Sequence, residues 1–259
     1  ADKNNRPAKY SKDNVPYKPK HHLPISLDGV EKGDFTMVFG FPGKTQEYLP
    51  SFAVEQIVND LNPAKIAIRD AALKVTDGYM RQDQAIKIQY ASKFAGIANY
   101  WKKWIGESQG LKKSNAVGIK KNFEKDFSSK VASAGKQAEY GNLLPQFEKL
   151  YKDITPYALA NDYFQEVVLR NNELLSVGFR LYQLENAYKQ GGEQAFNDRK
   201  NNLITGLESL YKDYNKNVDK DVFEAIVALY GKNAPKDLTP SIIQNVDYSV
   251  LANEVYTKS

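Results

Sequence analysis

The pattern of apolar and polar residues predicts a mainly helical chain. From residue 51 to residue 256, apolar side chains recur every three or four positions, which places them on one face of an α-helix. Ser51 is a suitable N-cap, Asn62-Pro63 is expected to end the first helix, and Pro156 is expected in the first turn of a later one. We expect helices over residues 51–61, 64–77, 86–105, 111–141, 143–151, 156–190, 195–214 and 218–230, and a weaker helix or irregular tail over 242–256.

The first 48 residues have a different pattern. Four prolines interrupt a polar sequence before residue 25, which predicts an extended segment. In GDFTMVFGFPG, residues 33–43, the side chains of Phe35, Met37 and Phe39 fall on one face of a predicted β-strand that ends in a turn. No second strand of equal strength follows, so we expect its partners outside this chain. The sequence therefore predicts an extended arm with one strand over residues 1–48 and a helical bundle or array over residues 49–259.

The helix expected over residues 86–105 carries both tryptophans. Its apolar stripe consists of Ile86, Tyr90, Phe94, Ile97, Trp101 and Trp104. The opposite face is made mostly of small residues, with Asn99 in its middle. By residue type, Asn99 is first interpreted as an asparagine that hydrogen-bonds a neighbouring helix or water. The alternative is a functional side chain on a thin surface that a ligand or another chain can approach.

Composition and charge exclude several classes of protein. The chain has no cysteine, which excludes a disulfide scaffold, a thiolate zinc site and a cysteine nucleophile. Its formal charge of +5 is spread over lysine-rich helical faces with few nucleic-acid signatures, which favours solvated faces, so no nucleic-acid partner is predicted. No apolar run is long enough to span a membrane. Because the chain does not begin with methionine, we interpret it as a processed protein or, in preference, as a piece excised from a longer one.

No catalytic or metal-binding motif is evident in the sequence. Its two histidines, His21 and His22, are adjacent and cannot both reach one face of a strand, so no metal site is predicted. Nothing supports either of them as the base of a Ser-His-Asp arrangement. The sequence contains no phosphate-binding loop, nucleophile elbow or His-Glu-x-x-His motif, and no cofactor is predicted.

Three ordered stretches resemble one known family. They are RPAKYSKDNVPYKPKHHLPIS over residues 6–26, GDFTMVFGFPG over residues 33–43 and YASKFAGIANYWKKW over residues 90–104. Together they are similar to the middle of bacterial dipeptidyl peptidases of the dipeptidyl peptidase 7 and 11 type. These are serine exopeptidases with a chymotrypsin-like double barrel that is interrupted by a large helical domain. After about Lys112 the chain resembles the family in its general sequence character more than in specific motifs.

The resemblance implies that catalysis and substrate recognition belong to different parts of the whole protein. The catalytic histidine, aspartate and serine of the family lie outside this chain, and none of Asp2, Asp13 and Asp34 stands in the family's Asp-Phe-Ser context. The chain alone is therefore expected to be inactive. The helical domain covers the active-site cleft, and the asparagine of the family's Asn-Tyr-Trp motif, which maps onto Asn99, binds the substrate's α-ammonium. Supporting packing is then expected from the neighbouring aromatic residues Tyr100, Trp101 and Trp104.

The resemblance also implies partners and a location. The expected partners are a peptide substrate bound by its N-terminal dipeptide, the double barrel of the same polypeptide and a second copy in a homodimer. The expected location is the periplasm or cell surface of a Gram-negative bacterium, or the medium after secretion. Two alternatives belong to other classes: a non-enzymatic helical module that binds a protein through its aromatic helix, and a basic nucleic-acid binder with steeply salt-dependent affinity.

Overall fold

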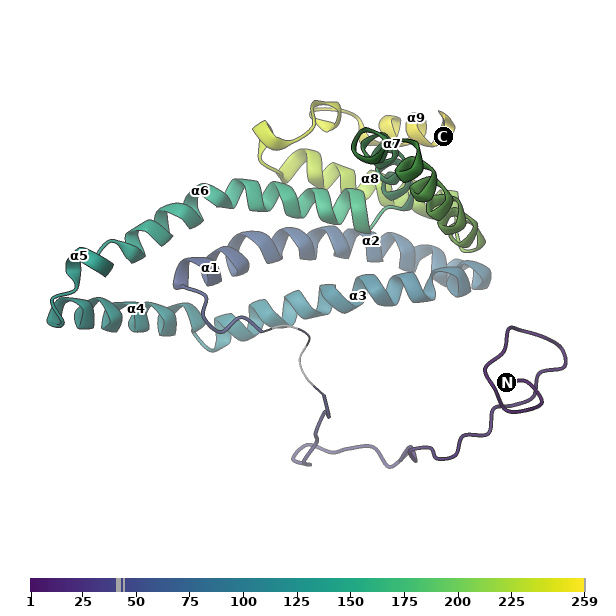
Figure 1. The fold of residues 1–259 in the computed structure, drawn as a ribbon, viewed down its shortest axis with the longest axis horizontal. Helices are drawn as coiled ribbons and strands as arrows, with labels where there is room; N and C mark the ends of the chain where they lie inside the picture. The colour runs from purple at the N-terminus through teal and green to yellow at the C-terminus, as the bar shows by residue number, and fades with distance from the viewer. Residues whose placement is uncertain (41–42, 44, 259) are drawn as a thin grey trace. The chain divides into compact units, whose positions relative to one another are not determined.

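The computed structural model describes residues 1–40, 43 and 45–258. The chain divides into two compact units, Ala1–Gln46 and Glu47–Ser259. Figure 1 draws the second unit as a group of helices. The two units are considered separately.

The described part of the first unit contains no helix or strand. Backbone hydrogen bonds of 2.9 Å in both directions between Ala1 and Val15 close a loop at its N-terminus. The strand predicted within residues 33–43 is wrong for the described residues: Phe35 and Phe39 are 90% and 97% exposed and belong to no sheet. The physical reason is that a strand needs a hydrogen-bonded neighbour, and the described residues provide none there. Phe41 and Pro42 of the predicted turn lie outside the described residues.

The second unit confirms the prediction of a mainly helical chain (Figure 1). Helix α2 packs against both α3 and α8, and α9 packs against α8. Among the described residues, the element order also includes the π-helical turns Ile57–Leu61 and Gln165–Arg170 and the short 3₁₀ turns Lys236–Leu238 and Ser241–Ile243. The bounds of the α-helices are α1 Ser51–Gln56, α2 Asn62–Gln82, α3 Gln84–Lys113, α4 Ala116–Ser133, α5 Gln137–Tyr140, α6 Leu143–Phe164, α7 Glu173–Lys212, α8 Lys216–Asn233 and α9 Tyr248–Lys258.

The first helical segment does not end at Asn62-Pro63 as predicted. A π-helical turn, Ile57–Leu61, joins α1 to α2, and Pro63 lies in the first turn of α2. Proline is tolerated in a first turn because its missing N–H would have no intrahelical acceptor there. The N-cap prediction is also wrong, since Pro50 occupies that position. Ser51 is buried and donates from its backbone N–H and its hydroxyl to the Glu124 carboxylate, at 2.6 and 2.7 Å.

Two later boundaries also differ from the prediction. Helix α6 continues through Pro156, which was expected to begin a new helix, and the chain breaks instead at Asn171-Asn172. The predicted break at Gly191-Gly192 is confirmed as a kink within α7, where Gly192 has φ 66° and ψ −156°. Glycine adopts this backbone conformation without the steric cost that a Cβ would add.

The core of the second unit lies among α2, α6, α8 and α9. Ile68 on α2, Ile226 on α8 and Ala252 on α9 are completely buried. The rings of Tyr163 on α6 and Tyr230 on α8 stack with their centroids 5.5 Å apart. This packing holds α2, which is also the helix that contacts the aromatic helix α3 along its length.

Candidate functional site

Helix α3 carries every site residue that the sequence predicts. Asn99 lies on its exposed face, and Tyr100 is 52% exposed. Trp101 is half-buried and Trp104 is buried. The structure thus gives the exposure of each residue. Binding of an α-ammonium by Asn99 and support by the three aromatic residues stay predictions.

The aromatic stripe of α3 is only partly buried within this chain. Tyr90 and Trp104 are buried, whereas Phe94, Ile97 and Trp101 are half-buried. On the other face, Ser92, Ala95, Gly96, Asn99 and Lys103 are all exposed. Apart from the adjacent residues and the backbone of the same helix, no atom of the described residues lies within 4 Å of the position that a Cβ on Gly96 would take. The small-residue face of α3 is thus accessible in this chain, with Asn99 near its centre.

A buried ion pair joins α2 to the π-helical turn Gln165–Arg170 that follows α6, and it also contacts this part of α3. The Arg69 guanidinium donates from Nε to Oε2 of Glu166 at 2.6 Å and from Nη2 to Oε1 at 3.2 Å. Its third nitrogen, Nη1, donates to the main-chain carbonyl of Ile97 at 3.1 Å. Because Arg69 and Glu166 are only 5% and 4% exposed, the two charges depend on each other for stabilisation.

Two aromatic rings of α3 also contact the Arg69 guanidinium. Its Cζ lies 4.9 Å from the ring centroid of Trp104 and 5.4 Å from that of Tyr100. Lys65, one turn earlier on α2, places its Nζ 4.9 Å from the same Trp104 ring and 3.2 Å from the Asp162 carboxylate. These cation–π contacts link α2 to the half of α3 that bears Asn99.

Asn171 completes the polar group around Glu166. Its Nδ2 donates to Glu166 Oε2 at 2.9 Å and to the Glu166 carbonyl at 2.8 Å. Asn171 Oδ1 and Trp101 Nε1 are buried and have no hydrogen-bond partner among the described residues. The Asn171 oxygen could accept a hydrogen bond, and the Trp101 indole N–H could donate one.

A second polar cluster lies at the start of α7. Asp219 on α8 accepts hydrogen bonds from Asn172 Nδ2 at 2.9 Å and from the Tyr256 hydroxyl at 2.7 Å. Glu173 accepts from Lys93 Nζ at 2.7 Å and from the Tyr90 hydroxyl at 2.9 Å. Desolvation raises the pKa of both carboxyl groups above their ordinary values, against the opposing effect of Lys93 and Tyr90 at Glu173 and of the Tyr256 hydroxyl at Asp219.

A cavity of about 510 Å³ lies beside both clusters. Gly96, Ile97 and Tyr100 of α3 line it, so it borders the turn that carries Asn99. The charged residues in its lining are Arg69, Lys93, Arg170, Glu173, Arg180 and Asp219.

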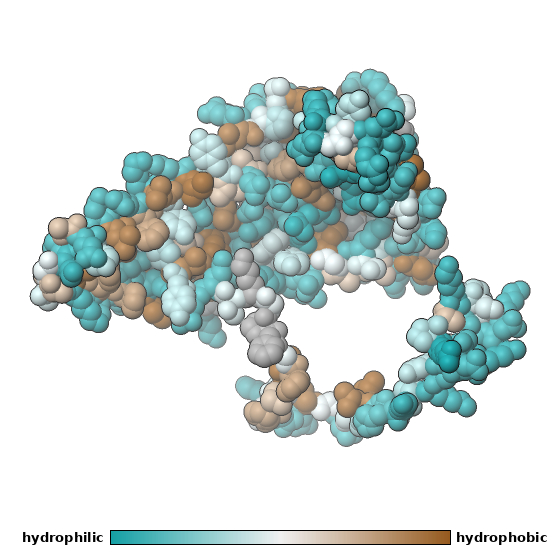
Figure 2. Space-filling model, viewed as in Figure 1, coloured by the Kyte–Doolittle hydropathy of each residue, from teal (hydrophilic) through white to brown (hydrophobic). Residues whose placement is uncertain are grey.

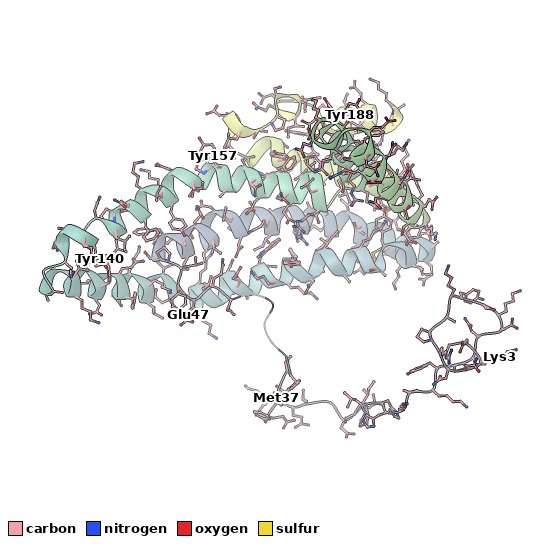
Figure 3. The ribbon with its side chains drawn as sticks, viewed as in Figure 1. Lys3, Met37, Glu47, Tyr140, Tyr157 and Tyr188 are labelled. Atoms are coloured by element: carbon pink, nitrogen blue, oxygen red, sulfur yellow. The ribbon has the colours of Figure 1, made fainter. Side chains whose placement is uncertain are left out.

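An exposed apolar surface runs along α6. Figure 2 shows hydrophobic side chains along this helix, and Figure 3 labels Tyr157 among them. They are between 37% and 60% exposed and recur every three or four residues: Leu143, Phe147, Leu150, Ile154 and Tyr157. Apolar surface of this regularity is usually covered by a partner.

The histidines and the acidic residues form no metal-binding cluster within the part of the chain that the structure describes. His21 and His22 are exposed in the first unit, with ring centroids 6.5 Å apart. Within residues 1–40, 43 and 45–258, no group of three or more His, Asp or Glu side chains is placed to hold a metal ion. None of the helices in the same part of the chain is both long enough and apolar enough to cross a membrane. What the site offers is an accessible asparagine on a helix that is fixed from behind by a buried ion pair.

This arrangement defines a helical domain with an accessible asparagine on α3. The comparison with known proteins gives the family: the Peptidase S46 model matches residues 1–259, and the chain belongs to that family. The resemblance drawn from the three sequence stretches is thereby confirmed.

The chain is 67% identical over its full length to an "Asp/Glu-specific dipeptidyl-peptidase" of Flavobacterium psychrophilum. It is 58% identical over its full length to a protein of the same description from Capnocytophaga gingivalis. A "Dipeptidyl-peptidase 7" of Porphyromonas gingivalis is 35% identical over 93% of the chain. The chain spans 36% of the length of the first two relatives and 33% of the third.

Solved structures show the same fold. The crystal structure of Porphyromonas endodontalis DPP11 in complex with the dipeptide Arg-Glu matches all of this chain and 38% of its own, with a TM-score of 0.66 and 23% identity. A crystal structure of DPP11 from the same organism, with no dipeptide named, matches with a TM-score of 0.63.

Sequence reasoning found the helix but missed the residues behind it. Arg69, Glu166 and Asn171 were not singled out, although Arg69 follows the buried Ile68 within an apolar stripe. A charged residue on the core side of a predicted helix was the available signal, because such a group needs a buried partner. The identity of that partner could not be read locally, since Glu166 lies 97 residues away.

Proposed function

We propose that this chain is the helical cap of a dipeptidyl peptidase that releases N-terminal dipeptides ending in Asp or Glu. One observation carries the proposal: 67% identity across the entire chain to a relative described as an Asp/Glu-specific dipeptidyl-peptidase. The second relative of that description, at 58%, supports the same specificity. Relatives described as dipeptidyl-peptidase 7 are more distant, at 28% to 36% identity.

In this proposal Asn99 binds the α-ammonium of the substrate. An ammonium has only donors, so its receptor must offer oxygen acceptors, and the Asn99 side-chain carbonyl is one. The exposed position of Asn99 among small residues of α3 supports this role, because a peptide terminus can approach it. A hydrogen bond to a charged group contributes about 1.5 to 3 kcal/mol. The chain supplies recognition, and the catalytic serine, histidine and aspartate belong to the rest of a serine peptidase.

The remainder of the polypeptide is proposed to cover the first unit. Leu27, Phe35 and Phe39 are at least 90% exposed here, which supports their burial against barrel strands outside this chain. The exposed apolar residues of α6 provide a further surface for the same polypeptide or for a second copy in a homodimer.

We place the enzyme in the periplasm or at the surface of a Gram-negative bacterium. Cell fractionation with an antibody to the full-length protein tests that location.

The test uses the full-length enzyme with dipeptidyl substrates that differ only in the residue before the cut. We expect kcat/KM to be higher for Asp and Glu than for Leu and Phe. Replacing Asn99 by Ala should lower kcat/KM about tenfold to a hundredfold, as the loss of one charged hydrogen bond predicts. Asn122→Ala, on the exposed surface of α4, is the matched control and should leave kcat/KM unchanged. Preference for Leu and Phe would refute the specificity, and an unimpaired Asn99→Ala enzyme would refute the role of Asn99.

A further inference from the structure

Arg69 is placed where an apolar residue would ordinarily be expected. It lies on α2 one turn before Ala72, which is completely buried, yet its own side chain is charged and only 5% exposed. A buried ion pair is often no more stabilising than apolar residues of the same volume. The need for a stable core therefore does not by itself explain the pair with Glu166.

The direction of the third Arg69 hydrogen bond indicates another role. Nη1 donates to the Ile97 carbonyl, in the middle of α3. In an α-helix that carbonyl already accepts the N–H four residues later, so the bond from Arg69 is additional. An additional donor from another helix satisfies no orphan group of α3, but it fixes the position of that turn relative to α2.

The aromatic contacts act on the same turn. Tyr100 and Trp104 face the guanidinium, at 5.4 and 4.9 Å from their ring centroids to Cζ. Together with the bond to Ile97, they attach one stretch of eight residues, 97–104, to a single side chain. Asn99 belongs to this stretch, and no hydrogen bond from its own side chain to a described residue holds it in place.

Small movements of this turn would displace Asn99. Side-chain ends lie about 5 to 6 Å from the axis of a helix, so a rotation of about 20° moves them by about 2 Å. Displacements of about 1 Å are enough to reduce the rate of a positioned reaction by a large factor. A rigid lateral contact is therefore required if Asn99 is to present its carbonyl to an ammonium group.

We propose that Arg69, held by Glu166, is a positioning residue that sets the rotation of α3 so that Asn99 meets the substrate's α-ammonium. Arg69 acts through the Ile97 carbonyl and does not touch the substrate. A lysine cannot replace it, because only the planar guanidinium can bond the carboxylate with two nitrogens while a third reaches the carbonyl. This inference rests on the proposed function of Asn99 and adds the residue on which that function depends.

The experiment uses the full-length enzyme and two variants of the ion pair. Arg69→Lys keeps the positive charge beside Glu166 but removes the planar guanidinium, which bonds the carboxylate and the Ile97 carbonyl at the same time. The double variant Arg69→Met with Glu166→Leu removes both charges, so no unpaired charge is left in the core if the single variant folds poorly. Lys65→Met is the matched control, because Lys65 also lies over Trp104 and forms an ion pair but makes no bond to the α3 backbone.

The first readout is recognition of the free amine, measured as the inhibition constants of a product dipeptide and of its N-acetylated form. We expect both ion-pair variants to weaken inhibition by the free dipeptide about tenfold with little change for the acetylated one. Combining Arg69→Lys with Asn99→Ala should give no further loss beyond Asn99→Ala alone. The second readout is amide hydrogen exchange in residues 97–104, which should become faster in Arg69→Lys and change much less in Lys65→Met, which loses one ring contact but no bond to the α3 backbone.

The outcomes separate this inference from the proposed function. If Asn99→Ala weakens inhibition but Arg69→Lys does not, or if the two losses simply add, the positioning role is wrong and the function of Asn99 stands. Unchanged exchange in residues 97–104 of Arg69→Lys also overturns the positioning role. If Asn99→Ala itself leaves inhibition unchanged, the proposed function and this inference both fall.

Discussion

At the scale of single residues, Asp219 joins three helices. From α8 it accepts the backbone N–H groups of Glu173 and Leu174 at 2.8 and 3.0 Å, and so caps the first turn of α7. It also accepts from the hydroxyl of Tyr256 on α9. A carboxylate at a helix N-terminus satisfies donors that have no partner within the helix and interacts favourably with the helix dipole.

Replacing Asp219 by Ala should destabilise the helical unit by about 3 kcal/mol or more, because several buried donors lose their acceptor together. This corresponds to a fall of roughly 6 to 12 °C in the unfolding midpoint for a domain of this size. Circular dichroism at the helical band during heating of the full-length protein measures it. Asp221→Ala is the control: Asp221 lies two positions further on α8 and accepts one hydrogen bond, from Tyr79, so a smaller fall is expected. Equal falls in the two variants would contradict the special role of Asp219.

At the scale of elements, the kink of α7 depends on Gly192. Its φ of 66° with ψ of −156° lies in a region that residues with a Cβ rarely adopt. The kink turns the second half of this 40-residue segment back toward the first half, because the rings of Tyr188 and Phe196 pack edge to face and Arg199 donates a hydrogen bond to Gln183. The sequence signal for this was local, a pair of glycines within an otherwise amphipathic pattern.

Gly192→Ala should therefore lower the stability of the helical unit by about 1 to 3 kcal/mol. Gly178→Ala, in the regular part of the same helix, is the matched control. A Cβ at Gly178 would meet no atom within 4 Å, so this change should raise stability by up to about 1 kcal/mol through helix propensity. Thermal unfolding of both variants in the full-length protein tests the pair. A Gly192→Ala protein as stable as Gly178→Ala would show that the kink is not required.

Prolines show the limit of local signals at this scale. Pro63 and Pro156 were both expected to mark helix boundaries, yet helical structure continues through each position. A proline costs the bond that its N–H would make, but surrounding packing can outweigh that cost. The hydroxyl of Thr155, beside Pro156, accepts a hydrogen bond from Gln56 Nε2 at 2.8 Å, so this part of α6 is attached to α1.

At the scale of the whole molecule, buried carboxyl groups predict how stability depends on pH. Burial raises the pKa of Glu173 in the folded state, whereas the unfolded chain has an ordinary value of about 4.3. Between these two pKa values the folded state binds more protons than the unfolded state. The contribution of Glu173 to the free energy of unfolding therefore falls as the pH rises above about 4.

Glu173→Gln removes this titration and tests its sign. We expect the difference in unfolding midpoint between the unmodified protein and the variant to decrease from pH 4 to pH 7. Calorimetric scans of the full-length protein at several pH values measure that difference. An increase over the same range would mean that the ion pair with Lys93, at 2.7 Å, outweighs desolvation and that the folded-state pKa is lowered.

The sequence by itself determined the helical character of residues 51–256, the kink at Gly191-Gly192 and the family. Each follows from signals that are local: apolar residues every three or four positions, paired glycines, and short ordered motifs. The same reasoning predicted a strand within residues 33–43 that is absent from the described residues. Alternation shows that a segment can pair, but pairing itself needs a neighbouring strand.

Only the tertiary structure decided which distant residues meet. Arg69 and Glu166 are 97 positions apart, and Asn172 and Asp219 are 47 apart. No periodicity relates such pairs, because a buried charge or amide can be satisfied by any element that the fold brings near it. The sequence identified the helix with Asn99, and the structure identified the buried contacts that hold this helix in place.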